Sequence, residues 1–191
     1  MRLNFAMSTM KACTPSDALP GFHDYDPAMP AVPDIRVAPV TPDLADAVRA
    51  LRLAPGQYAH VGDVSFNLAD AEANPDSDAM AVLAGDTVIG FYRLDYRPTA
   101  VSWKPLLGAS VVLRAFLLDR AWQGRGLSVR AILACCADLA RRRPACRLLA
   151  LNVDCCNLAA VRAYRQAGFV DTGELHFGGS AGPQRLMLRG L

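Results

Sequence analysis

The sequence predicts an α/β domain built on a mixed central sheet of about six to seven strands, flanked by helices. Its front half contains short strand patterns joined by turn residues, which favours antiparallel pairing. Its back half alternates strand, helix, strand, helix and strand, and such a crossover favours one parallel pair. We expect this domain over residues 35–191, with the proline-rich residues 1–34 as an irregular N-terminal extension.

The first part of the domain predicts one strand and one or two helices. Residues 35–37 are typical of a short strand, and Thr41 or Asp43 can cap a helix with apolar residues at helical spacing. Residues 63–78 are polar and acidic, which indicates a short helix with loops.

A β-hairpin is expected next. Residues 79–84 form an apolar strand, Gly85-Asp86 is a turn signal, and residues 87–97 form the returning strand. After a loop that contains two prolines, residues 110–118 predict another strand.

The back half predicts two helices and three strands. Residues 126–142 form a helix that Pro144 ends, and residues 157–167 form a shorter helix ended by Gly168. The expected strands are 147–153, 169–177 and 184–189. The inner face of the first helix is predicted from helical spacing to carry Val129, Leu133, Cys136, Ala137 and Ala140.

The composition restricts the class of protein. A length of 191 residues suits one domain, and a net charge of +2 argues against a general nucleic-acid binder. No apolar run is long enough for a membrane-spanning helix, and no secretory signal is evident. We therefore expect a cytoplasmic protein, either a monomer or a homodimer, with neither nucleic acid nor membrane as partner.

The cysteines and histidines indicate no metal site. The six cysteines lack Cys-x-x-Cys spacing, and the three histidines lack ligand-like spacing. Two of the cysteine pairs are adjacent in sequence, which is poor geometry for a disulfide. We expect reduced thiols, as is usual in the cytosol.

A turn with two glycines stands between the strand at 110–118 and the helix at 126–142. It reads Gln123-Gly124-Arg125-Gly126-Leu127-Ser128. Glycines let the backbone turn sharply and approach a ligand closely, and the start of the following helix offers free N–H groups and a positive dipole end. This combination predicts a pyrophosphate cradle, with a tight structural turn as the alternative. The glycine spacing fits neither a Walker A loop nor the dinucleotide-binding fingerprint.

Two segments together resemble the signatures of the GNAT N-acetyltransferase superfamily. Residues 116–128 resemble its acetyl-CoA signature, Gln/Arg-x-x-Gly-x-Gly/Ala, with the strand that precedes it. Residues 157–169 resemble its second block, Asn-x-x-Ala-x-x-x-Tyr followed by Gly-Phe. The two occur in the family's order, and the resemblance covers about residues 35–191. Ser128 departs from the usual Gly or Ala, but its small side chain should preserve the turn.

The resemblance implies acetyl-CoA as co-substrate and a site for it. Strand backbone would pair with the pantetheine arm, the turn amides would hold the pyrophosphate, and Asn157 would contact the arm of the cofactor. The cofactor-binding residues implied are Phe116, Leu117, Leu118, Gln123, Gly124, Arg125, Gly126, Leu127, Ser128, Asn157 and Tyr164.

The resemblance also implies Tyr164 as the catalytic acid that protonates the departing thiolate of coenzyme A. A phenol suits this task because it is neutral at pH 7 and can donate a proton over a short hydrogen bond. A core tyrosine on an amphipathic helix is the alternative. The general base stays open, since the strand at 110–118 contains no acid. Candidates are Asp119, Asp95, Glu72 and His60, besides a water chain or an amine that arrives unprotonated.

The predicted function is direct transfer of the acetyl group of acetyl-CoA to a primary amine, with a small cationic, polyamine-like metabolite as acceptor. The stretch 63–78 contains five carboxylates and no Lys or Arg, and in the resembled fold it borders the acceptor cleft, where carboxylates would attract an ammonium. A solvated acidic loop is the alternative. Two other functions remain: a protein or peptide N-acetyltransferase, and a non-catalytic acetyl-CoA-binding regulatory module. Tyr164 argues against the module, because a pure binder needs no acid.

Overall fold

The computed structural model describes residues 33–97, 101, 109–179 and 181–191. The predicted extension at 1–34 therefore lies almost wholly outside the described residues. No helix among the described residues is long and apolar enough to cross a membrane.

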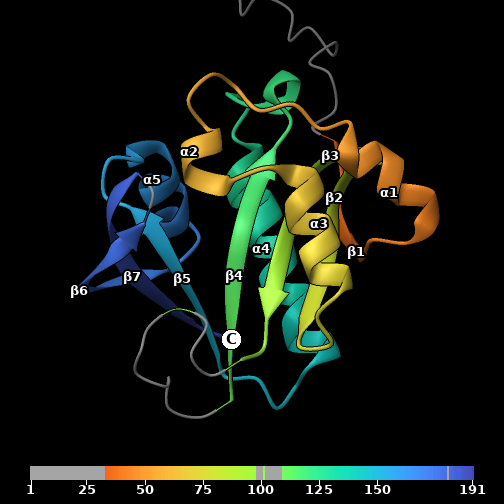
Figure 1. Ribbon diagram of the computed structural model, residues 1–191. Coiled ribbons are helices and arrows are strands. Elements are labelled where there is room, and N and C mark those ends of the chain that lie inside the picture. Colours follow the sequence, from red (N-terminus) through yellow and green to blue (C-terminus); the bar gives the residue numbers. More distant parts are fainter. Residues whose placement is uncertain (1–32, 98–100, 102–108, 180) are drawn as a thin grey trace, which may run out of the picture. The chain divides into compact units, whose positions relative to one another are not determined.

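Within the described residues, seven strands join into one mixed sheet (Figure 1). They lie in the spatial order β1-β2-β3-β4-β5-β7-β6, and of these described pairs β4 with β5 alone is parallel. This confirms the predicted α/β fold with an antiparallel front and a parallel pair at the crossover. The strands are β1 (Ile35–Pro39), β2 (Ser77–Ala84), β3 (Thr87–Asp95), β4 (Ser110–Leu118), β5 (Leu148–Asp154), β6 (Val170–Gly179) and β7 (Gly182–Gly190).

Helices cover both faces of the sheet (Figure 1). Side chains alternate between faces along a strand, and in β2 Met80 and Val82 belong to one core cluster while Ala81 and Leu83 belong to the other. The first cluster packs under α4 and α5, and the second under α1 and α3. The helices are α1 (Pro42–Arg49), α2 (Tyr58–Val61), α3 (Val64–Glu72), α4 (Leu127–Arg142) and α5 (Leu158–Gln166), and a 3₁₀ turn, η1, spans Arg120–Trp122.

The prediction of which residues form the buried face of α4 is wrong, because the face that packs on the sheet is rotated around the helix axis. Leu133, Ala137 and Ala140 are exposed, and of the predicted set only Cys136 is fully buried. The face that packs on the sheet instead carries Leu127, Ala131, Ile132, Cys135, Cys136, Asp138 and Leu139. A buried aspartate made this face look polar in the sequence. Asp138 is tolerated there because it pairs with Arg142 at 2.6 Å, four residues along the helix.

The segment between α1 and β2 is more helical than its sequence suggests. Helix α2 follows no predicted pattern, and its four residues contain no buried side chain. Helix α3 begins where the Asp63 carboxylate accepts a hydrogen bond from the Phe66 backbone N–H at 2.8 Å. Helix α2 contacts β4, whereas α3 packs against β2 and β3.

A bulge interrupts β4 and separates it from β5. On β3 only Tyr92 lies between the pairs Phe91↔Leu117 and Arg93↔Arg114, whereas on β4 both Ala115 and Phe116 do. Ala115 has φ = 49°, a left-handed value that is uncommon outside glycine. Pairing of β4 with β5 ends at Val112↔Ala150, below this bulge. The outer halves of the two central strands therefore diverge and leave space between them.

Candidate active site

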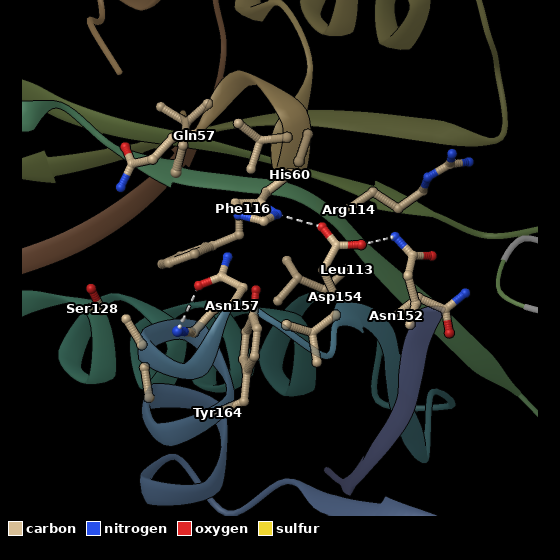
Figure 2. Close-up of a pocket in the computed structure, with 18 of the residues that line it drawn as sticks. Gln57, His60, Leu113, Arg114, Phe116, Ser128, Asn152, Asp154, Asn157 and Tyr164 are labelled. Carbon is tan, nitrogen blue, oxygen red and sulfur yellow. Dashed lines mark hydrogen bonds and ion pairs between the residues drawn. The ribbon is translucent and has the colours of Figure 1, made fainter. Parts of the chain in front are cut away.

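A pocket of about 840 Å³ occupies the space between the diverging strands. Its walls are the outer half of β4, the end of β5, helix α2, the start of α4, helix α5 and part of β6 and β7 (Figure 2). Of the described side chains that line it, the only Asp, Glu, Lys or Arg are Arg114 and Asp154. The pocket therefore has little net charge of its own.

The two-glycine turn forms one end of this pocket. Gly124 has φ = 72° and Gly126 has φ = 71°, so both positions favour glycine on backbone grounds alone. A Cβ at either would meet nothing within 4 Å, which leaves open space above the turn. In the described part of the chain, the N–H groups of Gly124, Arg125 and Gly126 donate no backbone hydrogen bond. These free donors, at the start of the 16-residue helix α4, suit the phosphates of a nucleotide co-substrate.

Most of the predicted cofactor-binding residues line the pocket. Those present are Phe116, Leu117, Leu118, Gln123, Gly124, Ser128, Asn157 and Tyr164. Three others lie around the turn but outside the lining. The guanidinium of Arg125 stacks over the Trp122 ring at 5.2 Å, Gly126 is exposed at the helix start, and Leu127 is buried in the core under α4. Leu127 thus holds the helix in place with its side chain.

Gln123 links the turn to helix α2. Its amide and that of Gln57 exchange two hydrogen bonds, at 3.0 and 2.9 Å, and its Nε2 also donates to the Leu118 carbonyl at 2.8 Å. The side-chain oxygen Oε1 of Gln57 accepts from the Ala54 backbone N–H at 3.0 Å as well. Helix α2 is thereby fixed relative to the glycine turn.

Asn157 and Tyr164 come from the two ends of α5. Asn157 caps this helix, since its Oδ1 accepts from the Ala160 N–H at 3.1 Å, and this leaves its amide nitrogen toward the pocket (Figure 2). Tyr164 packs edge-on against Phe116 and Phe169, with ring centroids 6.3 and 5.5 Å away. Burial raises the pKa of Tyr164, so the phenol stays protonated. No described group forms a hydrogen bond with its hydroxyl, which points into the pocket (Figure 2).

Three of the four candidate bases lie outside the pocket lining. Asp119 accepts backbone hydrogen bonds from Arg52 and Ala121, each at 2.8 Å. Burial alone would raise the pKa of Asp119, but these bonds hold it below its ordinary value. Asp95 is fully buried against Arg97 at 2.5 Å, and Glu72 is exposed on α3. His60 is the one candidate that lines the pocket.

The acidic stretch does not face the pocket. None of its five carboxylates belongs to the described lining. Asp63 caps α3, Asp70 pairs with Arg93 at 2.6 Å, and Asp78 pairs with Arg142 at 3.2 Å. The expectation that this stretch gathers cations at the acceptor cleft therefore has no support in the geometry.

Seven polar residues of the described pocket lining were not predicted as site residues from the sequence: Gln57, Asn67, Arg114, Asn152, Asp154, His176 and Gln184. Asp154 is the last residue of β5, and its carboxylate contacts His60, 94 positions earlier in the chain. The position of an acid at the carboxyl end of a buried strand was the only available signal. Its partner could not be identified before the path of the segment around α2 was known.

Comparison with known proteins identifies the family. The profile described as the Acetyltransferase (GNAT) family matches residues 45–169, which is more than half of the chain. The protein belongs to the GNAT acetyltransferase family. This confirms the resemblance seen in the sequence and the predicted enzyme class, an acetyl-CoA-dependent acetyltransferase. No curated protein matches the sequence closely enough to count as a relative.

Solved structures share the fold at low sequence identity. The aminoglycoside acetyltransferase AAC(6')-Ib, solved with paromomycin and acetyl-CoA, gives a TM-score of 0.67 at 17% identity, over 82% of this chain and 93% of that one. Spermidine N-acetyltransferase from Vibrio cholerae, solved with CoA and spermine, gives a TM-score of 0.62 at 16% identity, over 82% of this chain and 95% of that one. An acetyltransferase from Thermus thermophilus gives a TM-score of 0.58 at 24% identity, over 84% of this chain and 99% of that one.

Proposed function

We propose that this enzyme transfers the acetyl group of acetyl-CoA directly to a primary amine of a small molecule that is cationic in solution. The observation that carries the proposal is a single pocket with two different ends. One end has free turn amides at the start of α4, and the other holds a phenol on α5 and an imidazole on α2.

In this proposal the co-substrate lies along β4. The amides from Gln123 to Ser128 bind the pyrophosphate, and the backbone of Phe116, Leu117 and Leu118 faces the pantetheine arm, which the divergence of β4 from β5 leaves accessible. The free amide nitrogen of Asn157 donates to the same arm. The thioester then lies near Tyr164.

Tyr164 is proposed as the general acid. As the amine nitrogen forms its bond to the acetyl carbon, the carbon–sulfur bond breaks and the phenol gives its proton to the sulfur. The raised pKa of Tyr164 keeps that proton available throughout the neutral range. No covalent acetyl-enzyme is needed, and neither Cys155 nor Cys156 belongs to the described pocket lining.

A small cationic acceptor, such as a polyamine, is supported by fold similarity to enzymes solved with spermine and with aminoglycosides. The low charge of the pocket argues that recognition depends on neutral hydrogen-bonding groups. A screen of polyamines, aminoglycosides, amino acids and peptides, with release of free coenzyme A as readout, tests the proposal. We expect small amines to turn over. Faster turnover of peptide N-termini would favour the protein acceptor, and no release with any amine would favour a binding module.

A further inference from the structure

A histidine–carboxylate pair lies in the wall of the pocket. The His60 Nδ1 and the Asp154 Oδ2 are 2.6 Å apart, and both residues line the pocket (Figure 2). His60 comes from α2 and Asp154 from the end of β5, so the two sides of the pocket meet in this contact. The Asp154 side chain is 2% exposed, whereas the His60 ring is 23% exposed.

The hydrogen bonds around Asp154 determine which ring nitrogen of His60 is free. The other carboxylate oxygen, Oδ1, accepts from the Gln184 Nε2 at 2.9 Å. An ionised carboxylate only accepts hydrogen bonds, so the His60 Nδ1 must be the donor in their contact. In the neutral imidazole the proton is then on Nδ1 and the lone pair is on Nε2. No described group forms a hydrogen bond with that Nε2.

The imidazole is also held in position relative to the rest of the site. Gln57 directly precedes helix α2, and its side chain is bonded reciprocally to Gln123 of the glycine turn. In Figure 2 the His60 ring and the Tyr164 hydroxyl enter the pocket from opposite sides, near Phe116. This is the arrangement that acid–base catalysis of acyl transfer requires, because one group takes a proton from the nucleophile while the other gives one to the leaving group.

We propose that His60 is the general base of the reaction and that Asp154 and Gln184 are its positioning residues. The inference rests on the proposed function. The His60 Nε2 removes a proton from the bound ammonium, which frees the nitrogen lone pair to attack the acetyl carbon, and the resulting imidazolium is stabilised by the Asp154 carboxylate. Tyr164 gives its proton to the sulfur as the carbon–sulfur bond breaks. A second proton leaves the nitrogen as the amide forms and restores the phenol through solvent, and His60 releases its own proton to solvent. The products are the acetylated amine, coenzyme A and one proton.

Other titratable groups face the same pocket and must be separated from this pair. Besides Asp154 they are Arg114 on β4, His176 on β6 and Tyr164 on α5. Arg114 is 3.3 Å from the Asp95 carboxylate, so its charge is partly compensated. His176 has no carboxylate partner among the described residues, which makes it a matched control.

The test compares pH profiles of kcat/KM for the full-length wild type, His60→Asn, Asp154→Asn and the control His176→Asn. The asparagine amide in His60→Asn can still donate to Asp154, so the variant loses the base while it keeps the contact. In Asp154→Asn the new amide can donate to Nδ1 and move the ring proton to Nε2. Loss of a general base is typically worth about 10²–10⁴-fold in rate.

We expect both His60→Asn and Asp154→Asn to lose about 100-fold or more near pH 7. Their deficit should shrink as the pH approaches the pKa of the acceptor amine, because the free amine then needs no base. It should also be smaller for an acceptor of low amine pKa. His176→Asn, which also changes the pocket wall, should show no deficit with this dependence on pH and acceptor. A deficit that is the same at every pH and for every acceptor, or no deficit at all, would overturn the proposal.

Two controls separate this inference from its premises. Thermal unfolding and the KM for acetyl-CoA report whether a variant still folds and binds. If His60→Asn fails to fold, Asp154→Asn with the imidazole intact decides the matter through the same pH dependence. Failure of the wild type to acetylate any amine would instead refute the proposed function.

Discussion

Replacement of Tyr164 by phenylalanine removes one hydroxyl and little else. The ring keeps its edge-on contacts with Phe116 and Phe169, and no described hydrogen bond is lost. We therefore expect the free energy of unfolding to change by less than about 1 kcal/mol. Turnover should fall about 100-fold, at the low end for a general acid. That loss corresponds to about 2.7 kcal/mol of transition-state stabilisation.

The assay is kcat and KM from release of free coenzyme A, with thermal unfolding alongside. The KM for acetyl-CoA should change little, because the hydroxyl acts on the leaving thiolate. Tyr92→Phe is the matched control, since it removes another buried phenol that stacks near Phe116, at 6.4 Å, but lies outside the pocket lining. Unchanged turnover in Tyr164→Phe, with chemistry rate-limiting, would make this residue a packing residue only.

The remaining predictions concern the turn, the thiols and alkaline stability. Gly126→Val should raise the KM for acetyl-CoA strongly. The control is Gly85→Val, at a similar left-handed φ of 58° in the β2–β3 turn, which should show comparable backbone strain of about 1–2 kcal/mol without the change in KM. Equal changes in KM would contradict a pyrophosphate cradle at the glycine turn. The double variant Cys155→Ala, Cys156→Ala should keep most of the activity, and an acetyl-cysteine on the reaction path would refute direct transfer. Burial, followed by a hydrogen bond to a carboxylate, raises the pKa of Tyr96 to about 12. The unfolded chain loses this proton at lower pH, so the stabilisation is full below about pH 10 and is lost as the pH rises toward 12. In chemical denaturation, the free energy of unfolding of Tyr96→Phe should therefore fall less steeply over this range than that of the wild type. An equally steep fall in both proteins would contradict this role of Tyr96.

Local patterns in the sequence predicted the sheet well. The Gly85-Asp86 turn, Pro144 and Gly168 mark ends of elements that the structure places close to the predicted positions. These signals work because they depend on the backbone freedom of single residues. The inner face of α4 was harder, because an aspartate that is neutralised by an arginine four residues later does not look like a core residue.

The same distinction applies to the site: residues in contiguous motifs could be predicted, and residues brought together by tertiary packing could not. The glycine turn and the α5 motif are contiguous in sequence, so Gly124, Asn157 and Tyr164 could be assigned to one pocket before the structure was known. The histidine–carboxylate pair could not, because His60 and Asp154 come from segments whose approach depends on tertiary packing. The acidic stretch was wrongly expected to face the acceptor, because its sequence did not show that Asp70 and Asp78 form ion pairs with arginines outside the pocket lining.

The central claim, direct transfer of an acetyl group to a small amine, is tested most directly by the fate of a labelled acetyl group in a single turnover. Wild-type enzyme is mixed with acetyl-labelled acetyl-CoA and the best amine from the screen, and both the protein and the amine are analysed by mass spectrometry at successive times. We predict that the label appears on the amine nitrogen at the rate of coenzyme A release and at no time on the protein. Label that accumulates first on a protein side chain, or that never reaches any amine, would contradict the account.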